Sequence, residues 1–338
     1  MVEIIEICRL YEFEGLPLID VRSPSEYNHA HIPGAVNIPL FDDDERAMVG
    51  TRYTQAGKEA GFMLGLEIAG PKLPQYVKKL NALCHVHSPL IIYCWRGGMR
   101  SNAMAWLFSQ AGHDVKVVNG GYKAYRGFVR EQITDGWDFR IIGGMTGAGK
   151  TEVLLNLQNA GLQVIDLEAL ACHKGSVFGH LGQKEQPNNE WFENILWEKL
   201  RRLDRNKPVL IEDESRSIGR VSLPESFYMK MQHSQLFLLQ VNISHRTKRL
   251  IDDYGRYSRE QLIENIDKLQ GYLGGEIHKK AVGFVEGGDL GAAVELLLKY
   301  YDNKYTDSIT RYRPAGLITP VEGGGDSSLN AQKITVLI

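Results

Sequence analysis

Short apolar segments alternate with helical patterns between positions 16 and 119 of the chain. The apolar segments predict strands at residues 17–22, 35–38, 90–93 and 115–118. Between them, the spacing of Met104, Leu107 and Phe108 places apolar side chains on one face of a helix. Strands and helices in alternation are typical of a parallel sheet covered by helices. We therefore predict a first α/β domain at residues 1–134.

The same alternation begins again after a polar helical pattern at residues 122–134. Near-continuous apolar runs predict the buried strands of a second parallel sheet at residues 139–142, 162–166, 208–212 and 236–241. A doubly wound second α/β domain is therefore predicted at residues 135–313. Residues 314–338 include a Gly-Gly-Gly-Asp-Ser-Ser stretch and are predicted to form a flexible tail.

The composition is that of a globular protein with two cores. The chain has 338 residues, 43% of them hydrophobic. It has no apolar run of bilayer-spanning length, and its start lacks a signal-peptide pattern, so we expect a cytoplasmic protein. Four cysteines without a CxxC pair predict free thiols. The net charge of −2 leaves RNA binding open, because a nucleic-acid partner requires only a local basic patch.

A cysteine loop, which we define as residues 94–101, follows the predicted strand at 90–93. Its members are Cys94, Trp95, Arg96, Gly97, Gly98, Met99, Arg100 and Ser101. The glycines let backbone N–H groups turn toward an anion, and the two arginines add positive charge. A helix is expected to open near Ser101, which also favours a thiolate. We predict that Cys94 is a catalytic nucleophile; the alternative is a buried structural cysteine.

A phosphate loop, which we define as residues 144–151, follows the predicted strand at 139–142. It satisfies the pattern Gly-x-x-x-x-Gly-Lys-Thr, and an amphipathic helix follows it. The predicted diphosphate-binding residues are Gly144, Gly147, Gly149, Lys150 and Thr151. The Thr151 hydroxyl is a candidate ligand for Mg²⁺, and no tightly bound cofactor or resident metal site is predicted. ATP and a prenyl diphosphate would both satisfy such a loop.

Two carboxylates come at the ends of later predicted strands, where an α/β sheet places groups that face a ligand. Asp166 and Glu212 are therefore candidate ligand or second-step residues, and Arg216 follows closely on Glu212. The alternative for both carboxylates is a solvated position at a strand end.

The first domain resembles a rhodanese. The resemblance is carried by the cysteine loop and by residues 18–27 and 31–39, which read Leu-Ile-Asp-Val-Arg-Ser-Pro-Ser-Glu-Tyr and His-Ile-Pro-Gly-Ala-Val-Asn-Ile-Pro. It implies that Cys94 carries sulfur or selenium as a persulfide or its selenium analogue. The loop has one residue more before Arg100 than the common pattern Cys-x-x-Gly-x-Arg. We expect this wider ring to suit a larger anion such as selenophosphate.

The order of the motifs resembles the tRNA 2-selenouridine synthase family. A rhodanese-like domain precedes the phosphate loop, and the segments 166–179 and 211–219 follow it. The resemblance implies geranylation of wobble 2-thiouridine with geranyl diphosphate, and then replacement of the geranylthio group by selenium from selenophosphate. It also implies, as partners, the tRNAs for Lys, Glu and Gln and a transient contact with selenophosphate synthetase.

Basic residues of the second domain are the candidates for contact with tRNA. They are Arg201, Arg202, Arg205, Arg246 and Arg249. A charged helix face is more often simply solvated, so this prediction is weaker than those for the two loops. Tyrosines near residues 300–312 suit base stacking or packing.

Two other functions remain open from the sequence. A sulfurtransferase fused to an ATP-dependent small-molecule kinase would use Cys94 and would need no RNA. A non-catalytic sensor, in which the second domain gates a redox-active thiol, would keep its function without Cys94.

Overall fold

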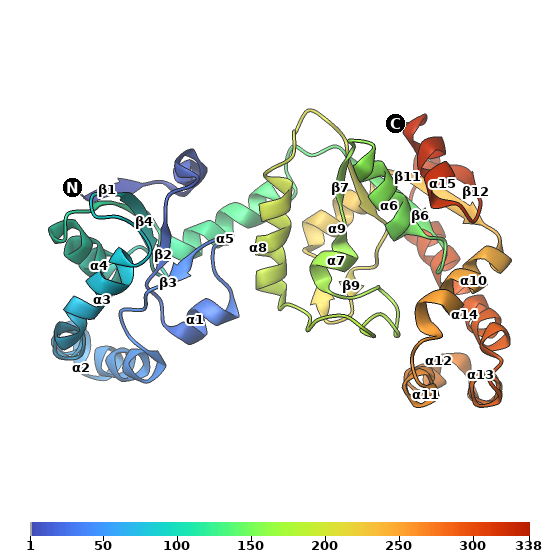
Figure 1. Ribbon diagram of the computed structural model, residues 1–338, viewed down its shortest axis with the longest axis horizontal. Helices are drawn as coiled ribbons and strands as arrows, with labels where there is room; N and C mark the ends of the chain where they lie inside the picture. The colour runs from blue at the N-terminus through green and yellow to red at the C-terminus, as the bar shows by residue number, and fades with distance from the viewer. Residues whose placement is uncertain (1) are drawn as a thin grey trace. The chain divides into compact units, whose positions relative to one another are not determined.

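The computed structural model describes residues 2–338 and divides into two compact units (Figure 1). Unit 1 runs to Gln132 and also includes Glu193–Glu198. Unit 2 contains Ile133–Phe192 and Lys199–Ile338. The change of unit at Gln132 lies close to the predicted division after residue 134. The sequence did not indicate that the middle of helix α8 (Asn189–Leu200) would belong to unit 1.

Unit 1 is built on a parallel sheet. Within the described residues its strand order is β1 (Val2–Ile5), β5 (Asp114–Val118), β4 (Pro89–Tyr93), β2 (Leu18–Asp20) and β3 (Val36–Asn37). Every neighbouring pair is parallel, which confirms the predicted α/β class. The four predicted strands are present, and the edge strand β1 is an addition.

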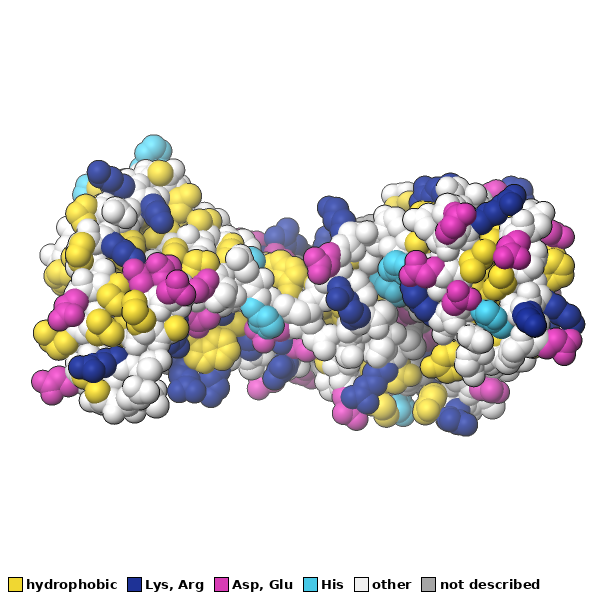
Figure 2. Space-filling view, turned by 90° about the horizontal axis from the view of Figure 1, so that it is seen from below, with side chains coloured by type: hydrophobic (Ala, Val, Ile, Leu, Met, Phe, Trp, Pro, Cys, Tyr) yellow, Lys and Arg dark blue, Asp and Glu magenta, His cyan; other side chains and the backbone are white. Residues whose placement is uncertain are grey.

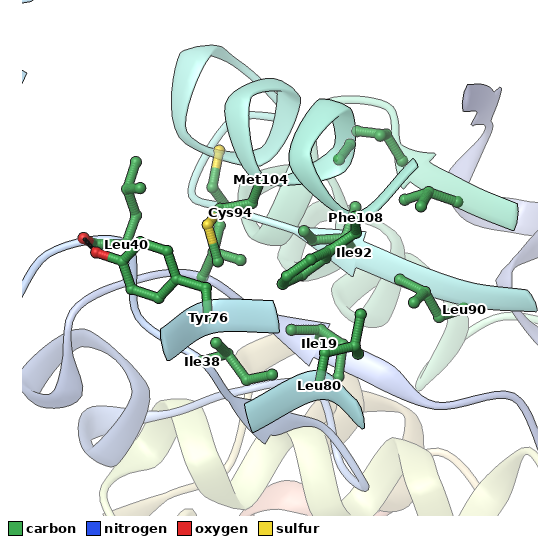
Figure 3. Packing of buried hydrophobic residues seen from close by; sticks show 14 of the residues in the cluster. Ile19, Ile38, Leu40, Tyr76, Leu80, Leu90, Ile92, Cys94, Met104 and Phe108 are labelled. Carbon is green, nitrogen blue, oxygen red and sulfur yellow. Dashed lines mark hydrogen bonds between the residues drawn. The ribbon is translucent and has the colours of Figure 1, made fainter. Parts of the chain in front are cut away.

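Helices cover both faces of this sheet. On one face, α2 (Asp43–Ala69), α3 (Leu73–Asn81) and α4 (Met99–Gln110) contribute side chains to a core around Ile19, Ile92 and Phe108. Figure 3 shows Cys94 beside Met104 in this cluster. Elsewhere in unit 1, η1 (Ile7–Phe13) and α5 (Gly121–Gln132) pack with α8, where Trp197 donates a hydrogen bond to Tyr11 over 2.9 Å.

Unit 2 contains the second parallel sheet. Its order within the described residues is β12 (Ile318–Gly323), β11 (Gln235–Val241), β6 (Phe139–Gly144), β8 (Val209–Glu212) and β7 (Gln163–Ile165). All its neighbouring pairs are parallel. The central strand β6 runs directly into the phosphate loop, and α6 (Lys150–Asn159) begins there. The strand order reverses at β6, and such a position is where open α/β sheets bind their ligands.

Further helices complete unit 2. Helices α6 and α15 (Ser327–Thr335) share one core, and α9 (Glu225–Gln232) packs Phe227 against Phe139 at a ring distance of 5.3 Å. A separate apolar cluster joins four helices. They are α11 (Arg259–Asp267), α12 (Gln270–Leu273), α13 (Gly275–Gly287) and α14 (Leu290–Tyr312). Two other helices, α7 (Leu167–Ala171) and α10 (Ile243–Tyr254), line the ligand-binding edge. The β9–β10 hairpin (Ser217–Ile218 with Val221–Ser222) follows β8 in the chain.

The predicted flexible tail at residues 314–338 is wrong. Strand β12 pairs with β11 along its whole length, and α15 buries Ala331 and Ile334 against the core that also contains α6. Gly323 is the last paired residue of β12, Gly324 and Gly325 form the turn to α15, and Asp326 then caps α15 by accepting backbone N–H bonds. The glycine-rich composition therefore marks a tight connection.

The surface carries charges of both signs. Figure 2 shows Lys and Arg side chains interspersed with Asp and Glu on the face displayed, in keeping with the net charge of −2. Within residues 2–338, no helix is both long enough and apolar enough to cross a membrane.

Candidate functional site

Cys94 lies between the end of β4 and the start of α4. Its Sγ atom accepts the backbone N–H of Gly98 at 3.3 Å and lies 3.3 Å from the Ser101 hydroxyl oxygen. The side chain is only 4% exposed. The thiol therefore occupies a pocket of hydrogen-bond donors at the carboxyl edge of the sheet.

These donors decide the protonation of the thiol. Burial alone would raise the pKa of Cys94, but hydrogen bonds from the Ser101 hydroxyl and from backbone groups of Arg96, Ser101 and Gly98 more than offset it, so the pKa lies below its ordinary value. A lowered pKa increases the fraction of nucleophilic thiolate near neutral pH.

The first residues of α5 form backbone hydrogen bonds with the cysteine loop. The backbone N–H groups of Tyr122 and Lys123 donate to the carbonyls of Cys94 and Trp95 at 2.8 and 2.9 Å. Gly121 has a φ of +56°, and a Cβ atom there would lie 2.2 Å from the Cys94 carbonyl oxygen. Only glycine fits this close approach. The pattern of the cysteine loop contains no signal for this supporting residue.

The two arginines of the cysteine loop have different positions. Arg100 forms a two-pronged ion pair with Glu26, whose carboxylate also accepts the backbone N–H of Ser23 at the start of α1 (Pro24–His29). Arg96 is exposed, and it has no ion pair among the described residues. Arg100 thus fixes the loop, while Arg96 remains available to an incoming anion.

The phosphate loop has the backbone that its sequence predicts. Gly147 and Gly149 have φ values of +80° and +84°, which favour glycine. Burial would lower the pKa of Lys150, but Glu214, Glu168 and neighbouring carboxylates more than offset this, so its pKa is raised. Lys150 therefore keeps its positive charge, as a ligand for phosphate requires.

A buried network fixes the entrance to the phosphate loop. Tyr305 on α14 accepts the backbone N–H of Gly144 at 2.9 Å and donates to Asp213 at 2.9 Å. Arg313 in turn donates to the other oxygen of Asp213 at 2.6 Å. Neither Tyr305 nor Asp213 was assigned this role from sequence, because the contact joins segments far apart in the chain.

A cavity of about 570 Å³ opens at the phosphate loop. The whole loop lines one part of it, together with Asp166, Glu168, Asp213 and Glu214. Another part is apolar, and its lining comes from α11, α13 and α14. These apolar residues include Leu262, Ile266, Val285, Leu290, Val294 and Leu297. An anion-binding loop and an apolar lining thus share one cavity.

Carboxyl groups in and behind the acidic wall of this cavity have raised pKa values. Burial is the largest cause that raises the pKa of Glu168, of Glu212 and of Glu214, and the pKa of Glu214 reaches about 8. Asp166, Glu168 and Glu214 raise the pKa of Glu212 further by repulsion, and Glu168 raises that of Glu214, while Lys150 lowers the pKa values of Glu168 and Glu214. Glu168 and Glu214 carry no signal of this role in the sequence, since only the fold brings them together.

The three residues predicted as candidate ligand or second-step residues, Asp166, Glu212 and Arg216, lie in different environments. Asp166 lines the cavity, where it also caps α7 by accepting the Ala169 N–H at 2.7 Å. Glu212 is fully buried behind the wall, and its Oε1 accepts the Glu168 N–H at 2.7 Å. Arg216 is exposed and lies 3.6 Å from Glu225. The prediction that Glu212 meets the ligand directly therefore needs correction.

Thr151 is the candidate magnesium ligand. Its hydroxyl donates to Glu168 at 3.4 Å. Within residues 2–338 no cluster of three or more His, Cys, Asp or Glu side chains has metal-binding geometry. Magnesium at Thr151 stays a prediction.

One predicted tRNA contact is wrong. Arg246 is 3% exposed, because it forms a two-pronged ion pair with Asp302 and donates to the Thr146 carbonyl. Arg249 also faces the phosphate loop and donates to the Gly147 carbonyl at 2.8 Å. The other three candidates, Arg201, Arg202 and Arg205, follow the end of α8 at Leu200 and do not lie on the helix itself.

Both domains of the chain match models of known protein families. A family model described as a rhodanese-like domain matches residues 8–127, and one described as a tRNA 2-selenouridine synthase AAA domain matches residues 137–280. The fold and the two loops thus define a rhodanese-like domain followed by a P-loop domain.

Relatives cover most of the chain. A tRNA 2-selenouridine synthase of Pseudomonas fluorescens (strain Pf0-1) is 37% identical over 86% of this chain and 87% of its own length. One from Shewanella loihica is 35% identical, with 86% of each chain covered. The chain belongs to the tRNA 2-selenouridine synthase family. Among solved structures, the N-terminal domain of a putative ATP/GTP binding protein from Clostridium difficile 630 is 36% identical over 38% of this chain and 98% of its own, with a TM-score of 0.35.

Proposed function

We propose that this protein is a tRNA 2-selenouridine synthase that works in two steps. It first transfers a geranyl group from geranyl diphosphate to the sulfur of wobble 2-thiouridine. It then replaces the geranylthio group with selenium from selenophosphate, through Cys94. The observation that carries the proposal is the similarity to enzymes of this name over most of the chain, with both loops intact.

The cavity of unit 2 supports the first step. A thiocarbonyl sulfur attacks an alkyl carbon more readily when the leaving group is stabilised, and the N–H groups of the phosphate loop with protonated Lys150 suit a departing diphosphate. The apolar lining from α11, α13 and α14 suits a hydrocarbon chain attached to that diphosphate. These two properties together favour geranyl diphosphate over ATP.

The cysteine loop supports the second step. Alkylation makes the C2 carbon of the base electrophilic, so that a selenium nucleophile can displace the geranylthiol. Cys94 has a lowered pKa, and exposed Arg96 lies two residues from it. This combination suits binding of the anionic donor selenophosphate, whose selenium is already at the oxidation level of a nucleophilic selenide.

The substrates follow from this reaction. We propose the tRNAs for Lys, Glu and Gln as acceptors, a transient contact with selenophosphate synthetase, and a cytoplasmic location, where these partners would be found. Exposed Arg202 and Arg205 are retained as candidate contacts for tRNA phosphates.

Mass spectrometry of tRNA nucleosides tests the proposal. Wild-type protein is incubated with a 2-thiouridine-containing tRNA and geranyl diphosphate, and then with selenophosphate; the same tRNA with uridine at the wobble position is the control. We expect S-geranyl-2-thiouridine and then 2-selenouridine, with no product from the control. If neither product forms, and ATP is hydrolysed without tRNA in the presence of magnesium, the fused kinase is the better description.

A further inference from the structure

Glu214 stands beside Lys150 and Glu168 in the wall of the phosphate-loop cavity. The carboxyl groups of Glu214 and Glu168 lie close enough for each to shift the pKa of the other. Both converge on Gly175, where a Cβ atom would lie 2.8 Å from Glu214 Oε2 and 3.2 Å from Glu168 Oε1. The loop at residue 175 thus holds the pair at the edge of the cavity.

The other carboxylates that line this cavity already have partners. Asp213 is held by Arg313 and Tyr305, while Asp166 caps α7. Two more form ion pairs: Glu152 with Arg249 at 3.2 Å and Asp253 with Lys174 at 3.6 Å. Glu168 receives the Thr151 hydroxyl. Within residues 2–338, Glu214 is the lining carboxylate with no ion pair and no hydrogen bond from a backbone, hydroxyl or cationic donor, and its neighbour is the Glu168 carboxyl group.

Other side chains that line the cavity are poor proton acceptors. Lys150 has a raised pKa and stays protonated. Burial raises the pKa of Tyr254 to about 12, and it also raises the pKa values of Tyr301 and Tyr305. These phenols stay neutral at physiological pH. By comparison, Glu214 has a pKa close to the working range of an enzyme.

We propose that Glu214 is the general base of the alkyl-transfer step. This inference rests on the proposed function. The sulfur of the 2-thiouracil ring forms a bond to C1 of the donor, and the C1–O bond breaks with its electron pair going to the diphosphate. The N3–H proton passes to the Glu214 carboxylate, and the N–H electron pair forms the C2=N3 double bond. The products are a neutral S-alkylated base, diphosphate and protonated Glu214.

The surroundings of Glu214 suit this role. Burial raises its pKa most, Glu168 and Asp213 raise it further, and Lys150 on α6 lowers it. Glu212 lies behind Glu168, fully buried with Oε2 unpaired, and burial raises its pKa well above the ordinary value. The base form of Glu214 therefore increases as pH rises through about 8.

Single-turnover kinetics of geranylation, measured against pH with saturating substrates, test the role. We expect the wild-type rate to rise with pH through about 8. Glu214→Gln should lose about 100-fold or more in rate, and it should lose the rising limb, since a general base contributes roughly this much. Its affinity for inorganic diphosphate should stay within about twofold, because phosphate contacts come from the loop and Lys150.

A second variant separates Glu214 from its partner. Glu168→Gln removes a like charge, so the pKa of Glu214 should fall and the rising limb should move to lower pH. Glu264→Gln, on the exposed face of α11, is the matched control and should leave the profile unchanged.

The two hypotheses fail in different ways. If wild-type protein makes no geranylated product, the proposed function fails. If wild type is active but Glu214→Gln keeps its rate and rising limb, or the wild-type rate falls through this range, Glu214 is not the base. A loss of diphosphate affinity equal to the loss of rate would instead assign Glu214 a structural role.

Discussion

The hydroxyl of Ser101 offers a direct test of how the cysteine loop activates its thiol. Ser101→Ala removes the oxygen that lies 3.3 Å from the Cys94 sulfur, while the backbone donors remain. A hydrogen bond to a charged group is worth about 1.5–3 kcal/mol. Because each 1.36 kcal/mol is a factor of ten, the thiolate fraction below the pKa should fall roughly 10- to 150-fold.

The assay is the rate of alkylation of Cys94 by iodoacetamide as a function of pH, followed by mass spectrometry of the peptide that contains it. The rate at fixed low pH should fall by the factor above, whereas the rate on the high-pH plateau should change little. Ser109→Ala, on the same helix but away from the thiol, is the matched control. An unchanged pH profile in Ser101→Ala would refute this account of thiol activation.

Three further changes test the supports of the two loops. Gly121→Ala should lower the free energy of unfolding by about 1–3 kcal/mol or more, because alanine would have to adopt a left-handed backbone conformation and its Cβ atom would clash with the Cys94 carbonyl oxygen. Gly127→Ala, at an exposed position of the same helix, should be neutral or stabilising; thermal unfolding measures both variants. Tyr305→Phe should leave the Gly144 N–H group and one Asp213 oxygen without their partner, which should lower the free energy of unfolding by about 1–3 kcal/mol and weaken diphosphate binding in calorimetry. Tyr312→Phe, at an exposed position of the same helix, should change neither the stability nor the diphosphate affinity. Deletion of residues 314–338 should destabilise unit 2 and make the protein aggregate, and an unchanged melting profile would contradict the assignment of β12 and α15 to its core.

The features that could be predicted from the sequence are those that depend on residues close together in the chain. Buried strands of the two sheets appear as continuous apolar runs, and both anion-binding loops depend on glycines and charged residues that are adjacent in the chain. Strand β12 was missed because Pro320 and the following glycines interrupt its apolar pattern. As an edge strand, β12 tolerates such residues.

Features made by distant segments could not be predicted. Gly121 matters because its backbone approaches Cys94, and Tyr305 matters because α14 returns to the phosphate loop. From the sequence Arg246 is a candidate surface cation, but in the fold it forms an ion pair with Asp302. In each case the role depends on a contact that no spacing within one segment encodes.

The central claim is that the two loops perform separate, successive steps on one tRNA. The most direct test incubates 2-thiouridine-containing tRNA, geranyl diphosphate and selenophosphate with Cys94→Ser, with Lys150→Ala, and with both variants mixed, and measures nucleosides by mass spectrometry. We predict that Cys94→Ser accumulates the S-geranyl nucleoside, that Lys150→Ala makes neither product, and that the mixture makes 2-selenouridine. Formation of 2-selenouridine by either variant alone would contradict the claim.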